Sequence, residues 1–418
     1  MLDWPIFMDW LSFAARWLHV ITGIAWIGSS FYFIALDLGL RKVPTLPEGA
    51  HGEEWQVHGG GFYHIQKYLV APAALPEHLT WFKWESYATW MSGFALMCIV
   101  YYAGADLYLI DREVWDIRPA PAIFTSILSL GIAWLLYNGL CRSPLKDHPT
   151  VLMIVLYVGL VAFAWGYTQL FTGRAAFLHL GAITATIMSA NVFLVIIPNQ
   201  KIVVADLKAG RAPDPKYGQI AKLRSTHNNY LTLPVLFLML SNHYPLAFGT
   251  EYNWVIASLV FLMGVTIRHF FNSMHARQGK PWWTWIATTV LFIAIMWLST
   301  EPRILQQTAV EAGFKPAKRE FTHVSEPFAE SVHFDDAYGT VQARCSMCHA
   351  REPLWPGIVA PPKGVALETA ADVARHAREI YLHSGRSHAM PPANVTAMES
   401  EERAQIVRWF EGVSGGIH

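Results

Sequence analysis

Long apolar segments, separated by polar connections, fill the first three quarters of the chain. Each segment is long enough to cross a hydrocarbon core of about 30 Å as an α-helix. The pattern predicts an all-α, polytopic membrane bundle of eight transmembrane helices over residues 1–300. The predicted spans are 8–37, 85–103, 119–141, 150–169, 177–197, 226–247, 253–275 and 282–299.

The composition agrees with a membrane protein. Hydrophobic residues make up 53% of the chain and charged residues only 15%, and there are 18 tryptophans. The formal net charge is zero, so nothing in the charge balance favours nucleic acid or another polyanion as a partner. The partner expected of the bundle is the lipid bilayer.

Lysine and arginine residues gather on one side of the predicted bundle. The connections rich in them are 38–84, 142–149, 198–224 and 276–281. The alternate connections hold only Arg112, Arg118 and Arg174. Because basic connections face the cytoplasm, both termini are expected outside. The opening sequence MLDWPIFMDW is acidic, unlike the start of a cleavable signal peptide.

A CxxCH motif made of Cys345, Cys348 and His349 predicts covalent attachment of haem c. The two thiols of such a motif bond to the haem vinyl groups, and the imidazole binds the iron. A zinc or thiol-redox site is the alternative, but it needs further ligands, and Cys98 and Cys141 lie in distant apolar segments. Haem c is attached outside the cytoplasmic membrane, which agrees with the orientation from the basic residues.

Met390 is the expected second ligand of the haem c iron. It precedes two prolines, which stiffen the loop and suit a thioether ligand on the opposite haem face. His383 and His388 are alternative ligands, and core filling is the alternative role of a lone methionine.

The end of the chain completes the expected domain. Residues 399–410 (ESEERAQIVRWF) are acidic at first and then carry spaced apolar positions, which predicts an amphipathic helix. Residues 330–418 are therefore expected to form a small class I cytochrome c domain. A polar segment at 301–329 is the expected linker to the bundle.

His19 lies deep in the first predicted span, where an ionisable side chain is costly and often functional. One interpretation is an axial ligand to the iron of a haem b, because electrons must cross the bilayer to reach haem c. Glycines at 23 and 28 would allow a flat ring to approach. The alternative is a hydrogen bond between helices. For His179, near the outer end of the fifth span, the two interpretations are a ligand to an outer haem and a satisfied helix-end histidine.

Polar residues also cluster toward the cytoplasmic ends of the sixth and seventh spans. Those singled out as candidate catalytic residues are Arg268, His227, His269, Asn228 and Asn272. An arginine, several amides and imidazoles can hold a planar, anionic ligand rich in hydrogen-bonding groups and can transfer its protons. The alternative is a helix-end network that faces water.

The connection at 38–84 is long, aromatic and interrupted by three glycines at 59–61. Loops of this length are usually functional, and glycines allow close approach to a ligand. This segment is expected to form a lid or wall of the substrate site, with an interfacial aromatic belt as the alternative.

Three segments, RWLHVITGIAWIGSSFYFIALD, WQVHGGGFYHIQKY and LPEHLTWFKWESYATWMSGFALM, resemble the bacterial membrane-bound urate oxidase (urate hydroxylase) family. The resemblance extends to CSMCHA and AMPP near the end of the chain. It implies eight membrane helices followed by a cytochrome c domain in the bacterial cytoplasmic (inner) membrane, with both termini and the cytochrome in the periplasm. It also implies oxidation of urate to 5-hydroxyisourate, with electrons passed to cytochrome c.

Urate or a close purine is thus the expected substrate, and a soluble cytochrome c or terminal oxidase the expected acceptor. A cytoplasmic substrate site would lie about one bilayer thickness, about 30 Å, from haem c. Either a haem b near His19 bridges this gap, or the urate site lies nearer the outer face. The alternative functions are a purine or organic-anion transporter with a redox-sensing cytochrome, and a b-haem oxidoreductase acting on quinol or a porphyrin precursor.

Overall fold

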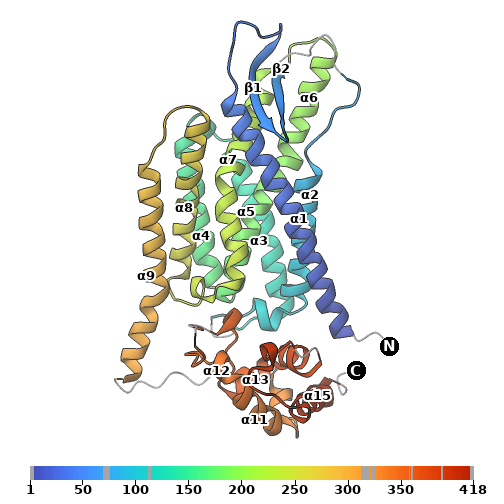
Figure 1. The fold of residues 1–418 in the computed structure, drawn as a ribbon, viewed down its shortest axis with the longest axis vertical. Helices are drawn as coiled ribbons and strands as arrows, with labels where there is room; N and C mark the ends of the chain where they lie inside the picture. Colours follow the sequence, from blue (N-terminus) through green and yellow to red (C-terminus); the bar gives the residue numbers. More distant parts are fainter. Residues whose placement is uncertain are drawn as a thin grey trace.

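Long helices run side by side in a bundle, with a β-hairpin beyond one end and a group of short helices against the other (Figure 1). The computed structural model describes residues 4–68, 76–111, 114–311, 321, 325–356, 358, 361–386 and 389–414. The bundle helices are α1 (Trp4–Gly39), α2 (Trp84–Met97), α3 (Pro119–Leu140), α4 (Pro149–Thr168), α5 (Gly173–Ala190), α6 (Ile197–Lys208), α7 (Pro215–Leu240), α8 (Asn253–His275) and α9 (Trp283–Glu311).

Short helical turns extend or connect these helices. The π-helical turns are η1 (Cys98–Tyr102), η2 (Ala105–Leu109) and η4 (Asn191–Ile196), and the 3-10 turns are η3 (Pro144–Asp147), η5 (Ser241–His243) and η6 (Pro245–Ala247). Because η4 joins α5 to α6 without a break, these three elements form one continuous helical segment, Gly173–Lys208.

Six helical segments in the described part of the chain are long and apolar enough to cross a membrane. The prediction of eight spans is not confirmed, because α2 and α7 are not among the six. α2 is α-helical for only 14 residues before η1 begins. α7 carries a run of charged and amide residues, several of them buried.

α7 and α8 approach closely where Gly264 faces Pro234, a proline inside α7. A Cβ atom on Gly264 would lie 2.5 Å from Pro234 Cδ. The absence of a side chain at residue 264 therefore sets the distance between the two helices. α5 lies deepest in the bundle and contacts α2, α3, α4 and α7.

α1 crosses one face of the bundle and packs mainly against α2 (Figure 1). None of its most apolar stretch is buried. Trp10, Trp17 and Ile24 expose most of their surface, which suits contact with lipid. The first turn of α1 reaches the C-terminal domain, where Ile6 packs against the core.

The connection between α1 and α2 contains an antiparallel hairpin, which corrects the all-α prediction. Its strands are β1 (Ala50–His58) and β2 (Gly61–Tyr68), paired from His58 with Gly61 back to Ala50 with Tyr68. Gly59 and Gly60 form the turn with φ of 61° and 79°, values that favour glycine in two-residue hairpins. Figure 1 places the hairpin beside α6, at the end of the bundle opposite the C-terminal helices.

The C-terminal domain consists of short helices that lie against the end of the bundle where α1 begins (Figure 1). Its elements are α10 (Glu326–Ala329), α11 (Phe334–Arg344), α12 (Ser346–His349), η7 (Pro362–Gly364), α13 (Ala370–Arg375), α14 (Ala377–Ile380), η8 (Tyr381–Arg386), η9 (Pro392–Asn394) and α15 (Ser400–Ser414). Trp409 and Ile406 of α15 are fully buried, so the predicted amphipathic helix is confirmed.

Two predicted connections are largely helical. The connection expected at 198–224 contains most of α6 and the first turns of α7, and the linker expected at 301–329 begins with the end of α9. Both segments are polar, and hydropathy alone ends a span where the apolar residues end although the helix continues.

Candidate functional site

Three consecutive residues of α7 are buried and face different neighbours. His227 contacts Tyr137 of α3, Asn228 contacts α5 and η4, and Asn229 contacts Arg268 of α8. A helix turns by about 100° per residue, so adjacent side chains reach different helices. This part of α7 therefore connects two separate polar clusters, one around Arg224 and one around Arg268.

The Arg224 cluster begins one turn before His227. Arg224 is 2% exposed. Its Nη1 donates to Asn191 Oδ1 over 3.2 Å, and its Nη2 donates to Asn138 Oδ1 over 2.8 Å. The guanidinium carbon lies 4.9 Å from the centroid of the Tyr137 ring. An aromatic face and two amide oxygens thus hold this cation in place.

Tyr137 and Asn191 connect this arginine to the predicted pair on α7. Asn191 Nδ2 donates to the Tyr137 hydroxyl and to Asn228 Oδ1, each over 2.9 Å. The Tyr137 hydroxyl lies 2.9 Å from His227 Nδ1. With the hydroxyl donating to Nδ1, the proton of a neutral His227 is on Nε2, an atom that is buried and has no partner.

The second cluster surrounds Arg268, which is 5% exposed. Its Nε donates to Asn229 Oδ1 over 3.3 Å, and its Nη2 donates to Asn272 Oδ1 over 3.0 Å. Asn272 Nδ2 donates to the same Asn229 oxygen over 2.9 Å. The Phe31 ring of α1 covers the guanidinium, with 3.9 Å between its centroid and the guanidinium carbon.

Neither buried arginine forms an ion pair with a carboxylate among the described residues. Arg224 Nε and Asn229 Nδ2 are also buried N–H donors without partners. A buried cation that lacks an anion is expensive, more so at membrane depth. Each cluster therefore holds a buried positive charge and an N–H donor without a partner, groups that an anionic ligand satisfies.

The structure divides the predicted catalytic residues among three places. Arg268 and Asn272 lie in one cluster, and His227 and Asn228 lie in the other. His269 lies in neither, because its ring packs against Trp283 of α9, with centroids 6.0 Å apart. Adjacent residues thus point to different faces of α8, and His269 does not join Arg268 in its cluster.

The sequence interpretation missed Arg224, Tyr137 and Asn191. Arg224 was placed in a basic cytoplasmic connection, whereas the structure buries it in α7. The spacing of three residues between Arg224 and His227 puts both on one face of a helix. This spacing was the available signal. Tyr137 and Asn191 are isolated polar residues in apolar segments, so their spacing gives no such signal.

His19 packs against α2. Its Nδ1 lies 2.9 Å from the Thr89 carbonyl oxygen and 3.2 Å from Ser92 Oγ. Gly93 makes room for the ring, because a Cβ there would lie 2.8 Å from His19 Cε1. The contact is the hydrogen bond between helices expected as the alternative role. It also fixes the tautomer with Nδ1 protonated, which leaves Nε2 as the free electron pair.

His179 is fully buried and uses both ring nitrogens. Nδ1 bonds to the Ala175 carbonyl over 2.7 Å, and Nε2 lies 2.6 Å from Ser126 Oγ. The ring also contacts Tyr101 and Phe171. Because neither nitrogen is free, the structure favours the satisfied histidine over the outer haem ligand.

The CxxCH residues lie at the end of α11 and in α12. His349 Nδ1 bonds to the Val365 carbonyl over 2.8 Å, which leaves Nε2 to bind iron. Burial lowers the pKa of the His349 imidazole and thus favours the neutral form that ligates metals. Both cysteines are free thiols, and burial raises the pKa of Cys345 to about 12.

The zinc alternative for this motif finds no support in the described part of the chain. No group of three His, Cys, Asp or Glu side chains converges there to hold a metal ion. A structural zinc site uses four ligands, and the motif itself supplies two cysteines and one histidine.

Arg403 of α15 fastens the loop of Met390. It donates to the Met390 carbonyl over 2.9 Å, to the Ser384 carbonyl over 2.6 Å and to Asn394 Oδ1 over 3.1 Å. The Met390 N–H donates to the His383 carbonyl over 2.7 Å. The alternative ligand His388 lies outside the described residues.

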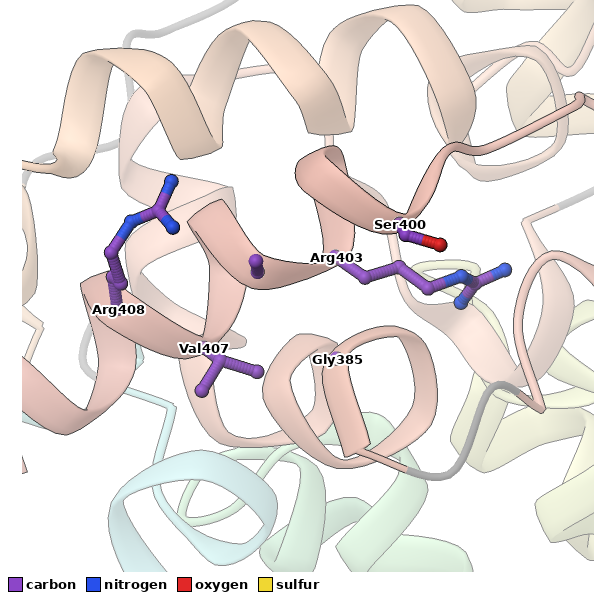
Figure 2. Close-up of a pocket in the computed structure, with 6 residues that line it drawn as sticks. Gly385, Ser400, Arg403, Val407 and Arg408 are labelled. Carbon is purple, nitrogen blue, oxygen red and sulfur yellow. The ribbon is translucent and has the colours of Figure 1, made fainter.

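A pocket of about 330 Å³ lies between η8 and α15, beside this loop. Figure 2 shows Arg403 and Arg408 at separate positions along α15, with Gly385 on the facing segment. The pocket belongs to the C-terminal domain, and none of its lining residues is in the two arginine clusters of the bundle.

The comparisons with known proteins concern the bundle. The model of the family described as urate oxidase N-terminal matches residues 5–299. No curated protein and no solved structure matches the chain. The matched segment contains both arginine clusters and His19 and ends before the CxxCH motif.

Proposed function

Because the chain belongs to the urate oxidase N-terminal family, we propose that it is a membrane urate:cytochrome c oxidoreductase. Urate and one water molecule give 5-hydroxyisourate, two protons and two electrons. The family supports an oxidoreductase that acts on urate, and six apolar helices support a membrane location. The cytochrome and the path of the electrons are the proposed additions.

The observation that carries the proposal is the pair of buried guanidiniums without carboxylate partners. Urate is flat, largely a monoanion at neutral pH, and bears carbonyl and N–H groups along its edges. Arg224 and Arg268 supply positive charge, and the amides of Asn228, Asn229 and Asn272 supply donors and acceptors at fixed positions. These residues bind and orient the anion.

His227 is the proposed proton-transfer residue. Its Nδ1 is held by the Tyr137 hydroxyl, so its Nε2 is the atom that faces the ligand. Oxidation of urate releases protons, and an imidazole of fixed tautomer can pass them on one at a time. Tyr137 and Asn191 orient this histidine and do not react themselves.

The haem c is proposed to be held by Cys345 and Cys348 as thioethers and by His349 and Met390 as iron ligands. When bound, the haem supplies one-electron redox chemistry, so the two electrons of each urate leave singly. Fixed contacts support this ligand set: Val365 orients His349, and Arg403 orients the Met390 loop.

A haem b with His19 as an axial ligand remains the proposed bridge across the bilayer. Its support is the free Nε2 of His19 and the space at Gly28, where a Cβ would meet nothing within 4 Å. The proposed orientation puts the basic hairpin end in the cytoplasm of a bacterium and the C-terminal domain in the periplasm. There it would pass electrons to a soluble cytochrome c or a terminal oxidase.

An anaerobic visible difference spectrum of the purified protein, with urate as the only electron donor, tests this function. Urate is expected to produce the reduced c-type band, and an additional b-type band would identify the bridge. Protein that dithionite reduces but urate does not would reject the proposal. Uptake of radiolabelled urate without haem reduction would then identify a transporter.

A further inference from the structure

A hydrogen bond joins the C-terminal domain to the bundle between two residues 271 positions apart. The Tyr108 hydroxyl, on η2, donates to Glu379 Oε1, on α14, over 2.6 Å. Figure 1 shows the C-terminal helices against the end of the bundle to which η2 belongs. The two domains therefore meet through specific side chains.

The bundle holds Tyr108 from several sides. The guanidinium carbon of Arg174, at the start of α5, lies 5.1 Å from the centroid of the Tyr108 ring. Thr172 Oγ1 donates to the Tyr108 carbonyl over 2.8 Å, and the Tyr101 ring lies edge-on with centroids 6.4 Å apart. The hydroxyl that reaches the other domain thus has a fixed position.

These contacts continue into the interior of the bundle. Arg174 Nε and the Tyr101 hydroxyl both donate to Asn242 Oδ1, over 3.1 Å and 2.9 Å. The ring of Tyr101, which is 3% exposed, meets the buried His179 ring at 6.0 Å. A continuous path of packed and hydrogen-bonded groups therefore runs from the buried core to Glu379.

Glu379 depends on this contact. Its Oε2 is inaccessible to solvent and has no hydrogen-bond partner, and burial raises the pKa of its carboxyl group. Because a buried carboxyl group cannot bond to water, Glu379 depends on its hydrogen bond from Tyr108. Displacement of Tyr108 would leave both oxygens unsatisfied, so the bond favours a single docked arrangement of the two domains.

We propose that Tyr108 and Glu379 are positioning residues that fix the C-terminal domain at the electron exit of the bundle. The exit is the corner formed by Tyr101, Tyr108 and Arg174. The inference rests on the proposed function, in which both electrons of each urate cross this junction singly to haem c and then to a cytochrome-type acceptor. Misplacing reacting groups by about 1 Å costs up to about 10²-fold in rate, so fixing the C-terminal domain against the bundle preserves the rate of haem reduction.

The variants Tyr108→Phe and Glu379→Leu, in the full-length protein with haem attached, test the inference. Stopped-flow reduction of the haem by saturating urate is expected to slow by about 10-fold or more. The urate concentration for half-maximal rate and the dithionite-reduced spectrum should not change. Glu411→Leu is the matched control, since it removes a Tyr–Glu bond of 3.0 Å within the C-terminal domain, and it should keep the normal rate.

Hydrogen–deuterium exchange gives a second readout that needs no urate. The segment 105–109 is expected to exchange faster in both variants than in the unaltered protein and the control. Normal rates of haem reduction in both variants overturn the inference, whatever the exchange shows. Failure of the proposed function is seen separately, as no reduction of the haem by urate in the unaltered protein.

Discussion

The centroid of the Phe31 ring lies 3.9 Å from the guanidinium carbon of Arg268, so an aromatic face of α1 covers a cation of α8. Water is kept from that side of the guanidinium, while its Nε and Nη2 donate to Asn229 and Asn272. Because charge interactions strengthen when water is excluded, this contact raises the attraction between Arg268 and an anion.

Removal of the Phe31 ring should therefore weaken the binding of urate. A cation–π contact contributes about 0.5–2 kcal/mol, so Phe31→Ala is expected to raise the urate concentration for half-maximal haem reduction by about 2- to 30-fold. Phe13→Ala, at a site on the same helix that is 59% exposed, is the control. An equal response from both variants would show that the ring of Phe31 has no special role.

Arg224 should be needed for activity although it was absent from the predicted site. Hydrogen bonds to a charged group contribute about 1.5–3 kcal/mol, so Arg224→Ala is expected to lower urate-driven haem reduction by about 10- to 100-fold. Arg224→Lys should recover part of this loss, because it restores the charge but not the planar fork. The dithionite-reduced spectrum should be unchanged in both.

The control for this prediction is Arg211→Ala, which removes an exposed arginine that pairs with Asp206. Its rate of urate oxidation should equal that of the unaltered protein. If Arg224→Ala retains full activity in folded protein, the anion is bound elsewhere, and Arg268 becomes the remaining candidate.

The junction between the domains should loosen as the pH rises. Burial raises the pKa of Glu379 above its ordinary 4.5, with Tyr108, Arg378 and Arg174 as the other titratable or charged neighbours. The docked state thus binds the proton more tightly, so its stabilisation is complete below pH 4.5 and is lost as the pH rises through the raised pKa. Protection factors for 105–109, measured from pH 5 to 8, should fall.

Glu379→Gln supplies the comparison for this pH dependence. Its amide does not titrate, so the same protection factors should stay level across the range. A parallel fall in both proteins would assign the pH effect to another group.

The hairpin can be tested through its turn. Gly60 has φ of 79°, where a side chain costs about 1–2 kcal/mol, so Gly60→Ala should increase hydrogen exchange in β1 and β2. If the hairpin acts as the expected lid, the half-saturating urate concentration should also rise. Gly61→Ala is the matched control, because residue 61 lies outside the positive-φ region and has open space around it.

The sequence predicted what depends on local pattern. The CxxCH spacing, the final amphipathic helix and the apolar helices each follow from residues close together in the chain. The hairpin was missed although two alternating runs flank Gly59 and Gly60, because its aromatic residues suit an interfacial loop equally well. Hydropathy assigned Arg224 to a connection, since only packing of α7 against α3 and α5 buries it.

Contacts between residues far apart in the chain also could not be predicted from a single sequence. Asn229 binds Arg268 across 39 positions, and Tyr108 binds Glu379 across 271. No local signal distinguishes these residues from other isolated polar groups, and their roles follow only once the helices are arranged in space.

α1 links the two ends of the protein mechanically. It carries Phe31 at one end, against Arg268, and Ile6 at the other, against the core of the C-terminal domain. A helix rises about 1.5 Å per residue, so the two contacts lie on a single helix long enough to cross nearly the whole bilayer. Little of that helix is buried. A tilt or rotation of this one helix would change both the contact of Phe31 with Arg268 and the packing of Ile6 against the C-terminal domain.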